Sequence, residues 1–138
     1  MKESFDEQKA KEELEKGYKP AEKLLNNPDA LERFLQRLEK KLRNIPLAGG
    51  ALASVPVLAS LLRSYAKKEY KDIPIGSIVA IVSALLYFVS PVDFIPDFII
   101  GVGYIDDALV ITVCLKLVES DVSEYIEWRK ENGKQIDL

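Results

Sequence analysis

The side chains best suited to chemistry in this 138-residue sequence are four aspartates in two short motifs. The motifs are residues 90–97, with the sequence SPVDFIPD, and residues 103–107, with the sequence GYIDD. Clustered carboxylate oxygens are the ligands that Mg²⁺ and Ca²⁺ prefer. A tight hairpin would bring the two motifs together and form a divalent metal site, which an enzyme could use. The residues that define the motifs are Ser90, Pro91, Asp93, Pro96, Asp97, Gly103, Tyr104, Asp106 and Asp107.

Helix capping explains the same aspartates, and the sequence favours this interpretation over a metal site. The segment 90–93 has the form of a capping box, with proline at the first helical position. Asp97 follows a proline and could begin the next turn in the same way. Asp106 and Asp107 come just after Gly103, near the first turn of a long helix, where the helix dipole favours carboxylates.

A third interpretation pairs one of these aspartates with a buried cation. Arg63 and Lys116 are the candidate partners, because each lies on an otherwise apolar helix face. Such a pair would fix the register of the helices rather than add much stability. This interpretation is compatible with capping.

The residues that the sequence lacks exclude several classes of enzyme. Histidine is absent, which removes the commonest general base and the commonest metal ligand. Cys114 is the only cysteine, so neither a disulfide nor a thiolate zinc site can form within one chain. No glycine-rich phosphate loop or complete dinucleotide motif is present. The sequence therefore predicts no catalytic residues and no cofactor, with Mg²⁺ or Ca²⁺ at the aspartates as the alternative.

Residues 1–43 predict an amphipathic, charged N-terminal helical extension. Its first part, Lys2–Lys16, is almost entirely charged and indicates either a solvated helix or a disordered segment. Asn27 then caps a further helix that has Pro28 at its first position. An amphipathic stripe on this helix predicts packing against the domain core. The stripe consists of Leu31, Phe34, Leu35, Leu38 and Leu42.

Residues 44–120 predict a helical core in which two apolar runs form the arms of a hairpin. The first run, Ile73–Val92, contains no charged residue, and the second is Phe98–Leu117. The dipeptide Ser120-Asp121 caps a final helix in the C-terminal segment, residues 121–138. No segment has the alternating pattern of a strand. The predicted class is all-α, a small helical bundle around an apolar helical hairpin.

The motifs also carry a family resemblance. Their pattern is Tyr87-x-x-Ser90-Pro91-x-Asp93-x-Ile95-Pro96-Asp97, followed by Gly103-Tyr104-x-Asp106-Asp107. On this pattern, residues 73–114 resemble the YkvA-like family of bacterial proteins, which is also related to a segment of a eukaryotic membrane-bound RING-finger protein. Segment 46–70 is similar to the helix that precedes this core in the family, whereas residues 1–43 lie outside it. The resemblance implies an α-helical domain, often predicted to be membrane-embedded, and it implies no catalytic role for any residue.

The first apolar run raises the question of a membrane span. Ile73–Val92 is long enough to cross a bilayer, which takes ~20 residues for ~30 Å. The basic residues before it, Lys67, Lys68 and Lys71, favour a cytoplasmic N-terminus. The Asp106-Asp107 pair in the return arm argues against a span, because each aspartate costs ~2.5–3.5 kcal/mol near the bilayer centre.

The alternative is a cytoplasmic protein in which Ile78–Val89 is the central helix of a bundle. The segments around Leu31, Leu58 and Leu109 would then wrap this helix.

The function predicted from the sequence is a membrane-associated structural or interaction module without catalysis. Its partner would be a membrane lipid or another membrane protein, and homo-oligomer formation is left open. A nucleic-acid partner is not expected, because the net charge is -3 and no basic stripe with interleaved aromatics occurs. The alternative function is a soluble helical domain that binds a divalent metal through the four aspartates, with or without enzymatic activity.

Overall fold

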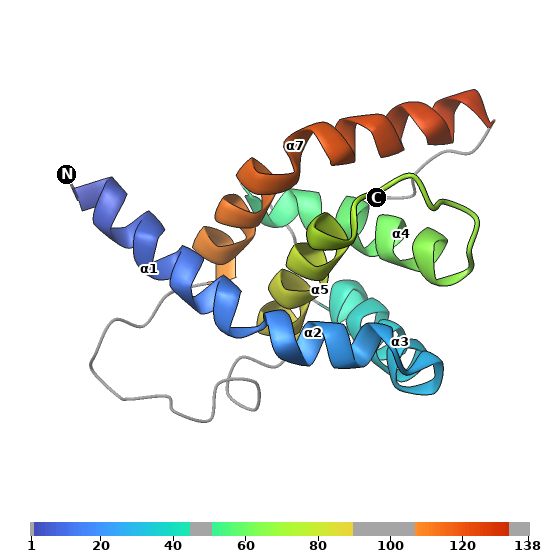
Figure 1. The fold of residues 1–138 in the computed structure, drawn as a ribbon, viewed down its shortest axis with the longest axis horizontal. Coiled ribbons are helices and arrows are strands. Elements are labelled where there is room, and N and C mark those ends of the chain that lie inside the picture. The colour runs from blue at the N-terminus through green and yellow to red at the C-terminus, as the bar shows by residue number, and fades with distance from the viewer. Residues whose placement is uncertain (1, 45–50, 90–106, 133–138) are drawn as a thin grey trace.

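The computed structural model describes residues 2–44, 51–89 and 107–132, with the backbone alone at residues 2–6, 44, 51, 52, 107 and 108. These residues form helices and no strand, so the predicted all-α class is confirmed. The elements are α1 (Lys2–Lys16), α2 (Tyr18–Leu25), α3 (Pro28–Asn44), the 3-10 helix η1 (Ala51–Ser54), α4 (Val55–Ala66), α5 (Ile75–Val89) and α7 (Asp107–Glu131) (Figure 1).

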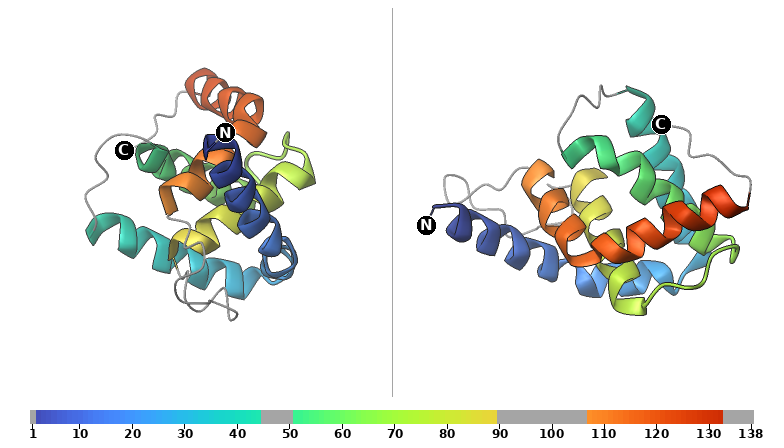
Figure 2. Two further views of the ribbon diagram at one scale, coloured as in Figure 1. Left: turned by 90° about the vertical axis from the view of Figure 1, so that its left-hand side faces the viewer. Right: turned by 90° about the horizontal axis from the view of Figure 1, so that it is seen from above.

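Helix α5 lies at the centre of the bundle and contacts α1, α2, α3, α4 and α7 (Figures 1 and 2). A helix that is apolar on all faces needs apolar neighbours on all faces, and the surrounding helices provide them. Its buried residues are Ile78, Val79, Ala80, Ile81, Val82, Ser83, Ala84, Leu85, Tyr87 and Phe88. The arrangement predicted as the alternative to a span, with this helix wrapped by the segments around Leu31, Leu58 and Leu109, is the one found.

The predicted span Ile73–Val92 contains a described helix of only 15 residues, Ile75–Val89. None of the helices in the described ranges has the length and apolar character that a membrane span requires.

Helices α5 and α7 form the predicted apolar hairpin. The thiol of Cys114 donates to the carbonyl oxygen of Ala80 at 3.6 Å, and the hydroxyl of Ser77 donates to Asp121 Oδ2. The earlier residue of α5 pairs with the later residue of α7, so the two helices run antiparallel. The C-terminal end of α5 and the N-terminal end of α7 therefore lie at the same end of the bundle.

The predicted break before the last helix is present, but it lies at Val118, two residues earlier than expected. Helix α7 continues through Ser120 and Asp121, and its one non-helical residue is Val118, with φ -116° and ψ 19°. Val118 is buried, and the helix bends there within the core. The carboxylate of Asp121 accepts the hydroxyl of Ser77 across the hairpin. A tertiary contact thus replaces the local cap that the Ser-Asp sequence indicated.

The expectation that α1 is solvated or disordered is also wrong. Ala10 and Leu14 have no exposed surface, and α1 packs against both α5 and α7. The hydroxyl of Ser83, which is buried in α5, donates to the carbonyl oxygen of Leu14 at 2.5 Å. Ala21 of α2 continues the buried face.

The predicted start of α3 and its amphipathic stripe are confirmed. The side-chain oxygen of Asn27 accepts the backbone N–H of Ala30 at 3.1 Å, and Pro28 is the first residue of the helix. This satisfies one of the N–H groups that a helix leaves unpaired at its N-terminus. The stripe packs on the core: Leu31, Phe34, Leu35 and Leu38 are buried, and Leu42 is partly buried against the same cluster.

Helix α4 ends in a Schellman motif that has a lysine where glycine is usual. The N–H of Glu69 donates to the carbonyl oxygen of Ser64, and the N–H of Lys68 donates to that of Tyr65, both at 3.0 Å. Lys68 has φ 63°, the left-handed conformation that this motif requires. An L-residue with a Cβ is strained in this region, and glycine is not.

Lys68→Gly should therefore raise the free energy of unfolding by about 1 kcal/mol, measured by urea denaturation. Lys67→Gly is the matched control, because Lys67 has φ -82° and gains nothing from glycine. A Lys68→Gly variant that is no more stable than the Lys67→Gly variant would show that residue 68 is not held at positive φ in solution.

Candidate functional site

The aspartate motifs are mostly outside the described residues. This applies to Ser90, Pro91, Asp93, Pro96, Asp97, Gly103, Tyr104 and Asp106, so their predicted capping, metal-binding and charge-pairing roles stay predictions. Asp107 is the first residue of α7, which agrees with its expected place in the first turn, although its side chain is not described. Helix α5 ends just before the motif segment and α7 begins just after it. Both of these helix ends lie at the same end of the bundle.

Helix α3 reaches this end of α5. The ammonium group of Lys41 donates to the carbonyl oxygen of Phe88 and lies 4.6 Å from the centre of the Phe88 ring. A cation at a helix C-terminus satisfies an orphan carbonyl and interacts favourably with the helix dipole. The N-terminal extension therefore holds α5 within two residues of the point where the first motif begins at Ser90.

Arg63 of α4 is paired with carboxylates of α3. Its Nε lies 2.6 Å from Glu39 Oε2, and a terminal nitrogen lies 3.6 Å from Glu32 Oε1. The side chain is 25% exposed, so it is partly buried, as the apolar face predicted. The guanidinium group fixes α4 against α3. Its predicted pairing with a motif aspartate involves side chains outside the described residues.

Lys116 is not a buried cation, contrary to the prediction. Its side chain is 61% exposed and pairs with Glu7 of α1. Lys116 lies on the outer side of α7 beside the charged α1. Such exposed pairs contribute little stability.

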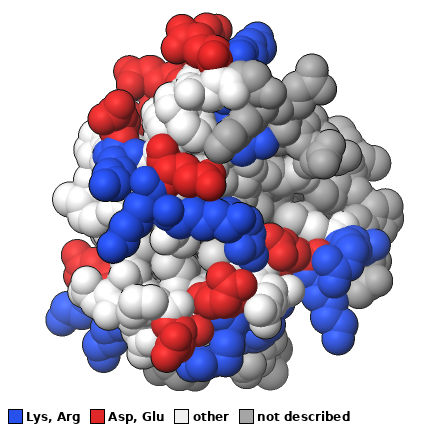
Figure 3. All heavy atoms as spheres, turned by 90° about the vertical axis from the view of Figure 1, so that its right-hand side faces the viewer, with Lys and Arg blue, Asp and Glu red and all other residues white. Residues whose placement is uncertain are grey.

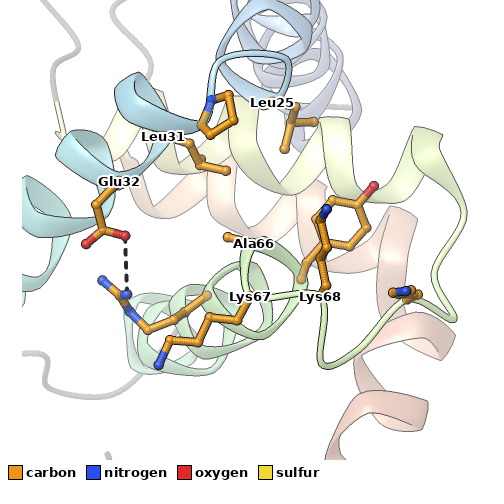
Figure 4. A pocket seen from close by; sticks show the side chains of 10 residues that line it. Leu25, Leu31, Glu32, Ala66, Lys67 and Lys68 are labelled. Carbon is orange, nitrogen blue, oxygen red and sulfur yellow. Dashed lines mark ion pairs between the residues drawn. The ribbon is translucent and has the colours of Figure 1, made fainter.

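A pocket of about 620 Å³ lies between the start of α3 and the end of α4 (Figure 4). Its floor and walls are apolar, and most of its rim is cationic. The lining residues are Leu25, Pro28, Leu31, Glu32, Arg63, Tyr65, Ala66, Lys67, Lys68 and Lys71. Figure 3 views the molecule from this end, where Lys and Arg side chains form a band with acidic side chains above and below it.

A second polar cluster holds the end of α7 against α4. The hydroxyl of Tyr125, which is fully buried, lies 2.6 Å from Ser60 Oγ and 2.9 Å from Ser64 Oγ. Its ring packs edge-on against Tyr70, with 5.1 Å between the centroids, and stacks on Trp128 at 5.9 Å. Burial, together with the carboxylates of Glu124, Asp72 and Asp121 and with Tyr125, raises the pKa of Tyr70. The aromatic rings pack against one another, and the Tyr125 hydroxyl is hydrogen-bonded to two serines. We therefore interpret this cluster as a structural contact between α4 and α7.

Tyr125→Phe should lower the free energy of unfolding by about 1–2 kcal/mol, because it removes two hydrogen bonds inside the core. Tyr65→Phe is the matched control, since the Tyr65 hydroxyl has no hydrogen bond within the described residues. Thermal or urea denaturation measures both. Equal stabilities of the two variants would mean that the Tyr125 hydroxyl is not bonded to the serines.

Among the side chains that the structure describes, no group of three or more His, Cys, Asp or Glu residues could hold a metal ion. Three of the four motif aspartates lie outside the described ranges, and only the backbone of the fourth is described. The predicted Mg²⁺ or Ca²⁺ site is therefore untested.

The pocket was not predicted from the sequence, although its charges were visible there. Arg63, Lys67, Lys68 and Lys71 follow one another at the end of α4. Their convergence with Leu25 and the start of α3 depends on how α3 packs on α4, and no spacing along the chain encodes that packing. The concentration of basic residues at positions 63–71 was the signal that could have drawn attention to this surface.

The described residues form an all-α bundle around the antiparallel α5–α7 hairpin. Residues 77–113, which lie in this hairpin, match the family described as "Protein of unknown function (DUF1232)". The chain is also 36% identical over 69 residues to the "Uncharacterized membrane protein YkvA" of Bacillus subtilis (strain 168).

That alignment covers 50% of this chain and 65% of the length of the Bacillus protein. The predicted YkvA-like resemblance is confirmed. The relation to a eukaryotic RING-finger protein remains an expectation from the resemblance. No solved structure matches the chain.

Proposed function

We propose that the protein is a membrane-associated structural or interaction module that performs no catalysis, with its charged N-terminal helices on the cytoplasmic side. The observation that carries the proposal is the 36% identity of half of this chain to a protein described as a membrane protein. The matched family covers residues 77–113, the segment that contains the aspartate motifs.

The charge distribution supports attachment at a membrane surface. Lys67, Lys68 and Lys71 are exposed on one face, and none of them has an ion-pair partner among the described residues. Basic residues next to an anionic leaflet contribute ~1 kcal/mol each to binding. This attachment requires no bilayer-spanning helix.

Fractionation of cells that produce the untagged full chain tests the proposal. The protein should sediment with the membranes at low salt, and a wash at high salt should release the part that is held by charge alone. Recovery of all of the protein as a monodisperse species in the first supernatant, without detergent, would contradict the proposal.

A divalent metal site at the aspartates is the second candidate function, and the hairpin geometry favours it. Because α5 and α7 run antiparallel, the segment with Asp93, Asp97 and Asp106 begins and ends at one end of the bundle. Titration with Mg²⁺, Mn²⁺ and Ca²⁺, followed by amide chemical shifts, should give changes confined to this segment. Asp106→Asn keeps the capping ability and removes the charge. It should abolish the shifts if the aspartates bind metal, and leave the helix content unchanged.

A further inference from the structure

We propose that the pocket between α3 and α4 binds the headgroup of an anionic phospholipid, with its apolar floor accepting the glycerol and the first acyl carbons. The inference deepens the proposed membrane association and rests on it, because it names the lipid chemistry and the residues that recognise it.

The shape of the pocket suits an amphiphile. Leu25 and Leu31 line one side, and Ala66 lies opposite them at the end of α4 (Figure 4). Lys67 and Lys68 extend in different directions from the same helix end. A ligand that is seated there contacts apolar carbon at the floor and ammonium groups at the rim, so it needs an anionic end and an apolar end.

The charge of the rim selects an anion. Four cationic residues line the pocket, and Glu32 is the single acidic one. Arg63 forms an ion pair with the Glu32 carboxylate at 3.6 Å and another with Glu39 at 2.6 Å. The three lysines have no ion pair with any described residue. Their ammonium groups are therefore available to an anion.

The backbone at the rim is strained at one of these lysines. Lys68 has φ 63° in the position of the Schellman motif where glycine would relieve the strain. Strained residues cluster at ligand-binding sites, where the side chain is needed in spite of its backbone conformation. A lysine here places an ammonium group at the rim that a glycine could not supply.

The volume favours a lipid over a free anion. Pockets for small molecules have volumes of roughly 300–1,000 Å³, and this one has about 620 Å³. Inorganic phosphate would use the lysines alone and leave the leucine floor uncovered. A phosphodiester headgroup with its glycerol uses both parts of the pocket.

Vesicle flotation with the full chain tests the proposal. The protein should float with phosphatidylcholine vesicles that contain phosphatidylglycerol, and should not float with vesicles of phosphatidylcholine alone. The Lys67→Gln/Lys68→Gln/Lys71→Gln variant should bind about 100-fold more weakly.

The matched control is Lys11→Gln/Lys19→Gln/Lys130→Gln, which removes the same charge from exposed positions on α1, α2 and α7. It should bind within about threefold of the wild type, because only general attraction is reduced. Circular dichroism confirms that both variants fold.

A second arm separates the lipid from a free phosphate. Short-chain phosphatidylglycerol, below its micelle concentration, should shift the methyl resonances of Leu25, Leu31 and Ala66, and inorganic phosphate should not. Equal shifts with phosphate would overturn the lipid assignment.

The outcomes also separate this proposal from the proposed function. Equal losses in the two triple-lysine variants, or no flotation of the wild type, would overturn the pocket proposal. Membrane sedimentation in cells would survive either result. Full recovery of the chain in the cell supernatant would contradict the proposed function independently of vesicle binding.

Discussion

Leu14→Ala should lower the free energy of unfolding by about 3 kcal/mol, because it opens a cavity where α1 packs on α5 and α7. Leu14 has no exposed surface, and its carbonyl oxygen holds the buried hydroxyl of Ser83. A loss of this size is possible only if α1 is an integral part of the core. A solvated helix attached to an independent bundle would lose almost nothing when its leucine is shortened.

Urea denaturation monitored by tryptophan fluorescence and circular dichroism gives the measurement. Leu117→Ala is the matched control, because Leu117 is 49% exposed on α7 and its truncation removes the same atoms from a solvated site. It should change stability by less than about 0.5 kcal/mol. If the two variants are equally stable, α1 does not pack as described.

The thiol of Cys114 should react with a soluble disulfide reagent at least about a thousandfold more slowly in the folded protein than in urea. Burial raises the pKa of this thiol from 9.0 to about 12. The reactive thiolate is therefore about a thousandfold scarcer at pH 8, and the side chain has no exposed surface.

Leu117→Cys in a Cys114→Ala background supplies an exposed thiol on the same helix as the control. Release of the coloured thiolate at pH 8 measures both rates. Comparable rates would show that the α5–α7 contact opens readily.

The same thiol makes stability depend on pH in one direction. The folded state holds the neutral thiol, so its contribution is complete below pH 9 and is lost as the pH rises from 9 toward 12. Cys114→Ala lacks this group. The stability difference between the wild type and Cys114→Ala should therefore shrink above pH 9, by at most about 1.4 kcal/mol per pH unit. A difference that stays constant between pH 7 and pH 11 would contradict the burial of Cys114.

Local chemistry predicted several features of the fold well. The cap at Asn27, the proline at the start of α3 and the stripe around Leu35 all follow from rules that act within one or two helical turns. The antiparallel hairpin followed from two apolar runs that are joined by a short segment. Each of these features depends on neighbours in the chain, so the sequence contains most of the information.

The features that were predicted wrongly depend on distant partners. Ser120-Asp121 has the form of a cap, but the break lies at Val118, and the carboxylate of Asp121 accepts a hydrogen bond from Ser77 of α5. Lys116 looked buried because its neighbours in sequence are apolar, although it points toward Glu7 on α1. The α3–α4 pocket escaped prediction for the same reason, since its lysines and leucines are brought together only by packing.

The order of the helices along the chain matters during synthesis. Helix α5 is the most apolar element described, and α1, α2, α3 and α4 precede it and contact it in the folded state. Domains begin to fold from the N-terminus as the ribosome extends the chain at ~5–20 residues per second. Of the five described helices that contact α5, four have therefore left the ribosome before α5 emerges. The nascent chain exposes this highly apolar segment when α1 to α4 are already available to cover it, and α7 follows.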